Sequence, residues 1–310
     1  ADLDCFCSAR ESATKVLVAI DGSKFSRTAV EFVSSRSSLV GVDPEVLLLN
    51  VQPPVPVYVV SSAGRKAVSK YHQDEAEIVL KPALSRLQDA GLNVSERYAV
   101  GQPAEQISVV AAKSKADLIV IGSHGHSGLR RLLFGSVTNA VMAGTTTPVL
   151  IIQAKQTPPA DSLKVGIAVD GSKYGRTAVK YVLRHGELFG ADPKLTVLHV
   201  VQDFASASMP DVAGFALPAF SADEMSALQD KQFESAVAPV RKLLKKAGVP
   251  AGEVRLHGNA GDELADYAKK KKLDLLVMGS HGHGAFKAAI LGSVTTRVAA
   301  ACDVALLLVR

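Results

Sequence analysis

Short apolar runs alternate with amphipathic segments along the whole chain. The first run, residues 15–20, is too short and too rich in β-branched residues for a helix, so it indicates a buried strand. An Asp-Gly-Ser turn follows it, and Ser23 or Ser26 is a suitable N-cap for a helix that ends near Ser34. The same alternation predicts further strands and helices up to the midpoint of the chain. The strands are residues 46–51, 94–100, 118–121 and 149–152, and the helices are residues 75–90, 104–115 and 136–143.

The second half of the chain repeats this order. A segment that begins Ala-Ile-Asp-Gly-Ser-Lys at residue 19 matches one that begins Ala-Val-Asp-Gly-Ser-Lys at residue 168, an offset of 149. Two glycine-rich motifs are 157 positions apart (279 − 122), so the second copy has gained eight residues (157 − 149) between these points. Identical residues at fixed offsets indicate an internal duplication. The second copy has its apolar runs at residues 164–169, 195–200, 254–257, 275–278 and 305–309.

The duplication defines the expected architecture. Strands that alternate with helices of this length indicate right-handed crossovers and a parallel sheet. We therefore predict an α/β protein of two tandem five-stranded, parallel, Rossmann-like domains with helices on both faces. The domains are residues 1–155 and 160–310, and residues 153–164, which contain two adjacent prolines, form the linker.

Each half carries a glycine-rich segment directly after its fourth predicted strand. Glycines let backbone N–H groups approach an anion closely, and a helix that begins after them favours negative charge at its N-terminus. This segment and the Asp-Gly turn both follow strands, so they should share one crevice at the carboxyl ends of the strands. Both copies have the pattern Gly-x-x-Gly, nine residues, Gly-Ser: Gly122, Gly125, Gly135 and Ser136, then Gly279, Gly282, Gly292 and Ser293.

Two other chemistries are weaker interpretations of the same segment. No Gly-Lys-Ser/Thr follows the glycines, so the segment is not a P-loop, and it does not follow a first strand as a dinucleotide fingerprint does. The pairs His124–His126 and His281–His283 could chelate a metal, but no cysteine or acidic partner repeats nearby. We expect these histidines to contact phosphate or solvent, and we assign no metal site.

Composition and charge limit the classes of partner that we expect. The 310 residues are 47% hydrophobic and 21% charged, with a formal net charge of +5 that is spread along the chain. Nucleic acid is therefore not an expected partner. No apolar run approaches the roughly 18 residues of a membrane span, no signal peptide is visible, and the cysteines give no disulfide framework. We expect a cytoplasmic protein with reduced thiols and no membrane partner, and the role of Cys5 and Cys7 stays open.

These features resemble the universal stress protein family in its tandem form, from about residue 15 to residue 310. The complete glycine pattern is similar to that of the nucleotide-binding branch of the family. The resemblance implies that each half binds ATP, either with or without Mg²⁺. It also implies that Asp21 contacts the nucleoside and that the backbone of Val51 contacts the adenine. It places the phosphates against Gly122, Ser123, His124, Gly125, Gly135, Ser136 and Val137. In the second half it gives the same roles to Asp170, Val200, Gly279, Ser280, His281, Gly282, Gly292, Ser293 and Val294.

The resemblance implies an ATP-binding stress or signalling module. We also expect little or no intrinsic hydrolysis, because few repeated residues could activate a water at the γ-phosphate, and we assign no catalytic residue. Two alternatives stay open: a slow ATPase or phosphotransferase, and an assembly module that holds no nucleotide. A catalytic group at the γ-phosphate would distinguish the enzyme from the binding module. The nucleotide content of the purified protein would distinguish the assembly module from both. The sequence leaves open the downstream partner, the stress signal and whether both sites are occupied.

Two further expectations concern the edges of the domains. Residues 52–70 and 202–223 are rich in proline or serine and follow the second strand of each half, so they are either disordered connections or lids over the ligand. The last strands, residues 149–152 and 305–309, should lie at sheet edges, which are pairing surfaces. Together with the resemblance, this predicts that the two domains form a pseudo-dimer and that the chain can also form a homodimer.

Overall fold

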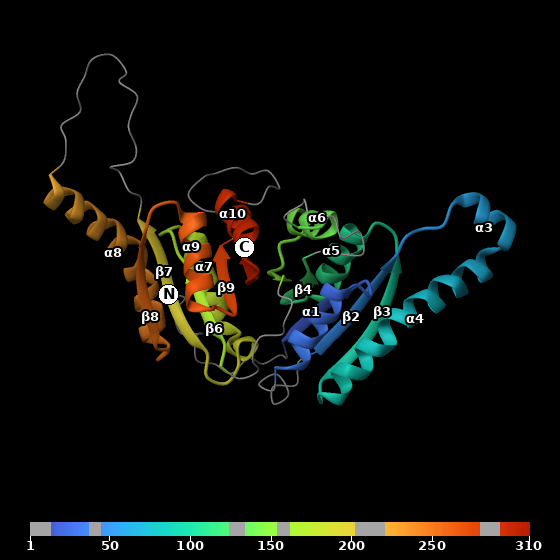
Figure 1. Ribbon diagram of the computed structural model, residues 1–310. Helices are drawn as coiled ribbons and strands as arrows, with labels where there is room; N and C mark the ends of the chain where they lie inside the picture. The colour runs from blue at the N-terminus through green and yellow to red at the C-terminus, as the bar shows by residue number, and fades with distance from the viewer. Residues whose placement is uncertain (1–13, 37–44, 124–133, 154–161, 202–220, 280–291) are drawn as a thin grey trace, which may run out of the picture.

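The computed structural model describes residues 14–36, 45–123, 134–153, 162–201, 221–279 and 292–310 (Figure 1). Strands and helices alternate in both halves, as the hydrophobic pattern predicts. The first half consists of β1 (Lys15–Ile20), α1 (Lys24–Ser34), β2 (Glu45–Gln52), α3 (Val57–Ala63), α4 (Arg65–Asp89), β3 (Asn93–Val100), α5 (Pro103–Ser114), β4 (Leu118–Gly122), α6 (Ser136–Gly144) and β5 (Val149–Ile152).

The second half repeats the order with one short 3₁₀ turn added. It consists of β6 (Lys164–Ala168), α7 (Lys173–Arg184), η1 (Gly186–Phe189), β7 (Lys194–Val201), α8 (Ala222–Lys246), β8 (Ala251–His257), α9 (Ala260–Lys271), β9 (Leu275–Gly279), α10 (Ser293–Ala301) and β10 (Ala305–Val309).

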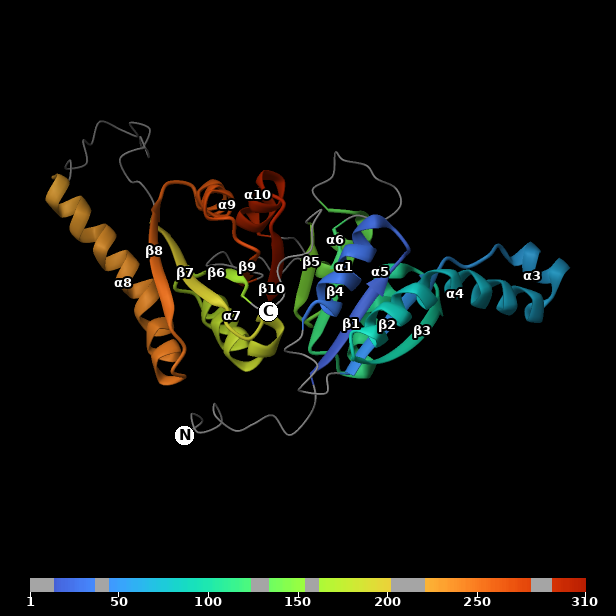
Figure 2. The same ribbon diagram turned by 60° about the horizontal axis from the view of Figure 1, so that its bottom comes forward.

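All these strands belong to a single ten-stranded sheet with the order β3-β2-β1-β4-β5-β10-β9-β6-β7-β8. Within each half every pair of neighbouring strands is parallel. The halves join where β5 pairs with β10 in antiparallel register, with Leu307 opposite Leu150. Figure 2 shows these two strands side by side between the halves. The fold is therefore α/β and mostly parallel, as predicted.

Helices cover both faces of the sheet, and the alternation of side chains along β1 shows how. Val16 and Val18 are buried in one core cluster with residues of α1 and α4. Leu17 and Ala19, which point to the other face, are buried with residues of α5 and α6. A strand that is buried on both faces has no polar positions, and this explains why residues 16–20 form a continuous apolar run.

The helix that follows β1 begins where the turn chemistry predicts. Ser23 is the N-cap of α1, and its hydroxyl oxygen accepts a hydrogen bond from the backbone N–H of Ser26 at 3.3 Å. In the second half Ser172 caps α7 and accepts from the N–H groups of Tyr174 and Gly175. At the other end of a helix, Lys115 ends α5 with φ of 55°, the left-handed conformation that glycine usually supplies.

The segment after β2 differs from both predicted alternatives. Residues 57–63 form α3, and α4 begins at Arg65, ten residues before the predicted start. Helical periodicity is hidden there because the buried positions of α4 begin with a polar residue, His72, before Ala76 and Leu80. No residue of α3 is buried, and the segment projects away from the sheet (Figure 1). It is therefore neither a disordered connection nor a lid, and most of its counterpart, residues 202–220, lies outside the described part of the chain.

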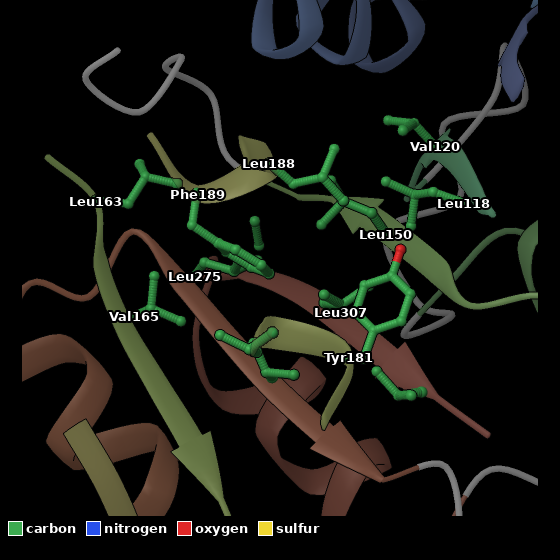
Figure 3. Packing of buried hydrophobic residues seen from close by; sticks show 14 of the residues in the cluster. Leu118, Val120, Leu150, Leu163, Val165, Tyr181, Leu188, Phe189, Leu275 and Leu307 are labelled. Carbon is green, nitrogen blue, oxygen red and sulfur yellow. The ribbon is translucent and has the colours of Figure 1, made fainter. Parts of the chain in front are cut away.

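The two halves share both core clusters. Leu150 of β5 and Leu307 of β10 are buried in the same cluster as Tyr181 and Leu188, as Figure 3 shows. The hydroxyl of Tyr181 also donates a hydrogen bond across the junction to the carbonyl oxygen of Asp117, at 3.1 Å. The junction between the halves is thus an extension of the core.

A buried polar group reinforces the junction. The hydroxyl of Thr14, just before β1, donates a hydrogen bond of 2.7 Å to Oε1 of Glu187 in η1. The same carboxylate oxygen lies 3.6 Å from Nδ1 of His185, a long separation for a hydrogen bond. Burial opposes ionisation of Glu187, but the interactions with His185 and Thr14 outweigh it, and the pKa of Glu187 is lowered.

Candidate functional site

A cavity of about 240 Å³ lies at the carboxyl ends of β1, β2 and β4 in the first half. Its floor is formed by the ends of these strands, and its wall by the first turns of α5 and α6. This is the edge of a parallel sheet at which ligands bind in open α/β folds. Among the residues that the sequence predicts as nucleotide contacts, the cavity brings together Asp21, Val51, Gly122, Gly135, Ser136 and Val137.

The conformation of Asp21 is fixed by the turn that it begins. Its Oδ1 accepts a hydrogen bond from the backbone N–H of Ser23 at 2.9 Å, which closes an Asx turn between β1 and α1. Asp170 makes the same contact with the N–H of Ser172 at 3.0 Å. Both carboxylates are therefore held at the strand end, where they can accept hydrogen bonds from a hydroxyl-bearing ligand.

Gly122 is the last residue of β4, and its lack of a side chain has a reason in the packing of the protein itself. A Cβ atom at this position would lie 2.7 Å from Cβ of Phe25 and 2.9 Å from the backbone carbonyl carbon of Phe25. Gly279 has the same environment, with Cβ of Tyr174 at 2.6 Å. These glycines let the first turn of α1 or α7 pack directly on the strand end, which is a requirement separate from any contact with phosphate.

Backbone hydrogen bonds fix the residues on either side of the glycine-rich segment. The N–H of Ser123, a buried residue, donates to the carbonyl oxygen of Ile152 at 2.9 Å. The N–H of Gly135 donates to the carbonyl oxygen of Ser123 at 2.7 Å. The hydroxyl of Thr138 donates to the carbonyl oxygen of Gly122 at 2.9 Å. The start of α6 is thereby held against the end of β4. Residues 124–133, which include His124 and Gly125, lie outside the described residues.

Two helices begin at the cavity without a side-chain cap. The N-cap residue of α6 is Gly135, which has no side chain. The N-cap residue of α5 is Gln102, whose side chain accepts no hydrogen bond from the helix start. Pro103 and Ser136, the first residues of these helices, line the cavity. The first N–H groups of a helix carry partial positive charge, so two such ends favour an anion beside the cavity.

Eight lining residues were not among the predicted contacts. Leu49 and Ile107 give the cavity its apolar wall, and the other six are Ala19, Ile20, Ser26, Pro103, Ile121 and Thr138. Leu49 could have been found, because it lies two residues before Val51 and so faces the same side of the sheet. Ala19, Ile20 and Ile121 lie beside predicted contacts at the ends of β1 and β4. The other four come from helices whose placement over the strand ends is not visible in a single sequence.

The second half holds the equivalent residues in equivalent elements. Asp170 follows β6, Val200 lies in β7, Gly279 ends β9, and Gly292 is the N-cap of α10. Ser293 is exposed at the first position of that helix, and Val294 is partly buried against the core. Ser280, His281 and Gly282 lie outside the described residues, as do Cys5, Cys7, His126 and His283.

Two other features bear on partners. No three His, Cys, Asp or Glu side chains gather into a possible metal site in the part of the chain that the structure describes. Within that same part, every helix is too short or too polar to span a bilayer. Cys302 is a buried free thiol, and burial raises its pKa.

Comparisons with known proteins agree with the duplicated architecture. A family model described as the universal stress protein family matches residues 13–153 and again residues 163–310. A universal stress protein of Mycolicibacterium smegmatis is 26% identical over 311 residues, which cover 97% of this chain and 99% of that protein. The universal stress protein YxiE of Bacillus subtilis is 33% identical over 147 residues, 45% of this chain and 98% of that protein.

The fold has a counterpart among solved structures. The crystal structure of a universal stress protein from Archaeoglobus fulgidus aligns with a TM-score of 0.68 at 20% identity. The alignment covers 96% of this chain and 98% of that one, so the likeness extends through both halves.

Proposed function

The chain belongs to the universal stress protein family, and we propose that it is an ATP-binding module whose nucleotide occupancy reports a stress or signalling state. The observation that carries this proposal is the cavity of the first half. It gathers Asp21 from the turn after β1, Val51 from β2, Gly122 from β4 and Ser136 from α6, the residue types that a nucleotide needs. We extend the proposal to the second half because its equivalent residues occupy equivalent elements.

The chemistry of the cavity suits the parts of a nucleotide in order. Leu49, Val51 and Ile107 form an apolar wall against which a flat base can pack. The carboxylate of Asp21 is an acceptor for ribose hydroxyls. The uncapped starts of α5 and α6 favour phosphate oxygens. The volume of about 240 Å³ is just below the range of about 300–1,000 Å³ typical of ligand pockets, so we place the nucleoside inside and the phosphates toward Gly135 and Ser136.

We propose that hydrolysis is slow or absent. Attack on a γ-phosphate needs an oriented water and fixed cationic groups. Asp21 is assigned to the nucleoside end, and its Oδ1 is engaged in the turn. The enzyme alternative therefore depends on residues 124–133 and 280–291, which lie outside the described part of the chain. Turnover above about 1 s⁻¹, the lower end of ordinary enzyme rates, in a sample free of contaminating ATPase would replace the binding module by an enzyme.

The proposal also includes the arrangement of the halves. The antiparallel pairing of β5 with β10 supports a pseudo-dimer of two nucleotide-binding domains within one chain. The proposed domain limits, residues 1–155 and 160–310, place this pairing between the domains.

Calorimetry with matched variants tests the two sites separately. We propose Val51→Trp to fill the first cavity and Val200→Trp to fill its counterpart. Wild-type protein should bind two ATP molecules, and each variant should bind one. The lost site should weaken at least about 100-fold, which corresponds to about 2.7 kcal/mol, because an indole occupies the space of the base.

Two outcomes would overturn the proposal. Wild-type protein that binds no adenine nucleotide, and that releases none on denaturation, would favour the nucleotide-free assembly module. Binding that neither tryptophan variant changes, with both variants folded by circular dichroism, would place the ligand elsewhere.

A further inference from the structure

A second hollow adjoins the nucleotide cavity of the first half. It is an open groove of about 640 Å³ between α5 and α6. Three residues line both the cavity and the groove: Pro103, Ser136 and Val137. These residues lie in the first turns of the two helices, the end of the cavity to which we assign the phosphates. The groove therefore continues outward from the phosphate end.

The corresponding surface of the second half is covered. At the offset of 157 between the glycine motifs (279 − 122), Ala104 and Ala140 of the groove correspond to Gly261 and Arg297. The side chain of Arg297 lies across Gly261 so closely that a Cβ on the glycine would be 2.6 Å from Cβ and 2.8 Å from Cγ of Arg297. Nε of Arg297 also lies 3.5 Å from Oδ1 of Asp262.

Burial reflects the same difference. Gly261 is buried, whereas Ala104 is only partly buried and Ala140 is exposed. The first half thus has small side chains and an open groove where the second half has an arginine that spans its two helices.

The lining of the groove indicates what can occupy it. Among the described residues that line it there is no lysine or arginine, and the one charged side chain among them is the carboxylate of Glu105, so this part of the lining disfavours a further anionic group. The hydroxyl of Ser108 already donates to the carbonyl oxygen of Ala104 at 2.9 Å and is left as an acceptor. Gln102 and Ser136 add polar groups at the inner end. Acceptors beside small apolar residues suit a neutral group that carries hydroxyls.

We propose that the α5–α6 groove is a subsite of the first half for a neutral, hydroxyl-bearing extension of the phosphate chain, such as a second ribose. The first half then accepts extended adenine nucleotides, while Arg297 restricts the second half to simple ones. This inference rests on the proposed nucleotide function, and it assigns different ligands to two halves that carry the same glycine motif.

The test compares ADP with ADP-ribose, which differ by the terminal ribose. In the Val200→Trp background only the first site binds nucleotide. In that background, Ala140→Arg gives the groove of the first half an arginine at the position that Arg297 holds in the second half. We expect Ala140→Arg to raise the Kd for ADP-ribose at least tenfold and to leave the Kd for ADP within about twofold. Ala112→Arg is the charge-matched control, because Ala112 is exposed on α5 and lines neither hollow. It should leave both constants unchanged.

The reciprocal change tests the second half. In the Val51→Trp background, Arg297→Ala should lower the Kd for ADP-ribose relative to that for ADP. Suppose that ADP binds wild-type protein, but Ala140→Arg raises the Kd values of ADP and ADP-ribose equally or changes neither of them. The proposed subsite is then wrong, and the nucleotide function stands. If ADP does not bind at all, the proposed function itself fails and the subsite fails with it.

Discussion

Gly122→Ala is the substitution for which the structure gives the most definite expectation. The sequence motif suggests that this glycine exists to admit phosphate. The structure adds a second reason, because the end of β4 packs directly on the first turn of α1. The two reasons predict different behaviour in protein that holds no nucleotide: a phosphate role leaves its stability unchanged, and a packing role lowers it.

The size of the effect follows from the distances. The added methyl carbon would lie 2.7 Å from Cβ of Phe25 and 2.9 Å from the carbonyl carbon of Phe25, against an optimum of about 3.5–4.0 Å for non-bonded carbons. Overpacking a core costs about 1–3 kcal/mol. We expect the upper part of this range, about 2–3 kcal/mol, because the opposing atoms are backbone and Cβ and cannot rotate away.

Urea denaturation of nucleotide-free protein, followed by circular dichroism, measures the change in unfolding free energy. Gly279→Ala should lower the unfolding free energy by a similar amount, because its added methyl carbon would lie 2.6 Å from Cβ of Tyr174. Gly144→Ala is the matched control, because its added methyl would meet only Oγ of Ser108 at 3.4 Å. Phe25→Ala should not rescue Gly122→Ala, because it keeps the Cβ atom. A loss below about 0.5 kcal/mol for Gly122→Ala, the range of ordinary surface substitutions, would refute the packing argument.

Two further predictions concern stability. Lys115→Gly should raise the unfolding free energy by about 0.5 kcal/mol, because relief of the left-handed conformation at φ 55° outweighs the entropy of glycine; a loss in urea denaturation would contradict this. Glu187→Gln should lower stability near neutral pH by about 1–2 kcal/mol by weakening the charged hydrogen bond from Thr14. The lowered pKa of Glu187 means that its ionised form stabilises the fold above the ordinary value of 4.5, and that this stabilisation is lost as pH falls through the folded pKa. The difference between wild type and Glu187→Gln should therefore shrink in urea titrations from pH 6 to pH 3, and a constant difference would rule out the carboxylate as its source.

Much of the fold could be predicted from the sequence because its signals are local. Continuous apolar runs mark strands buried on both faces, and β1, β5 and β10 have the predicted bounds. The Asp-Gly-Ser turn gives both the Asx turn of Asp21 and the cap at Ser23. These features depend only on side chains a few residues apart.

The features that could not be predicted depend on contacts between distant segments. The start of α4 is hidden because a buried histidine and exposed polar residues replace the apolar positions of its first turns. The tight packing at Gly122 requires knowledge of where Phe25 lies. Likewise, the groove between α5 and α6 results from Ala104 and Ala140, two alanines that carry no signal until the helices are placed together.

The same distinction explains why a duplicated motif does not imply two equal sites. Both halves carry the glycine pattern, but the first N–H groups of α5 have no side-chain cap, whereas Asn259 caps α9 by accepting from the N–H of Gly261 at 3.1 Å. The first turn of α9 also holds two carboxylates, Asp262 and Glu263, and that of α5 holds one, Glu105. Each carboxylate at a helix start offsets part of the positive end of the helix dipole, an interaction of about 0.3–1 kcal/mol. An anion should therefore be held less tightly beside α9, and the first half should fill before the second.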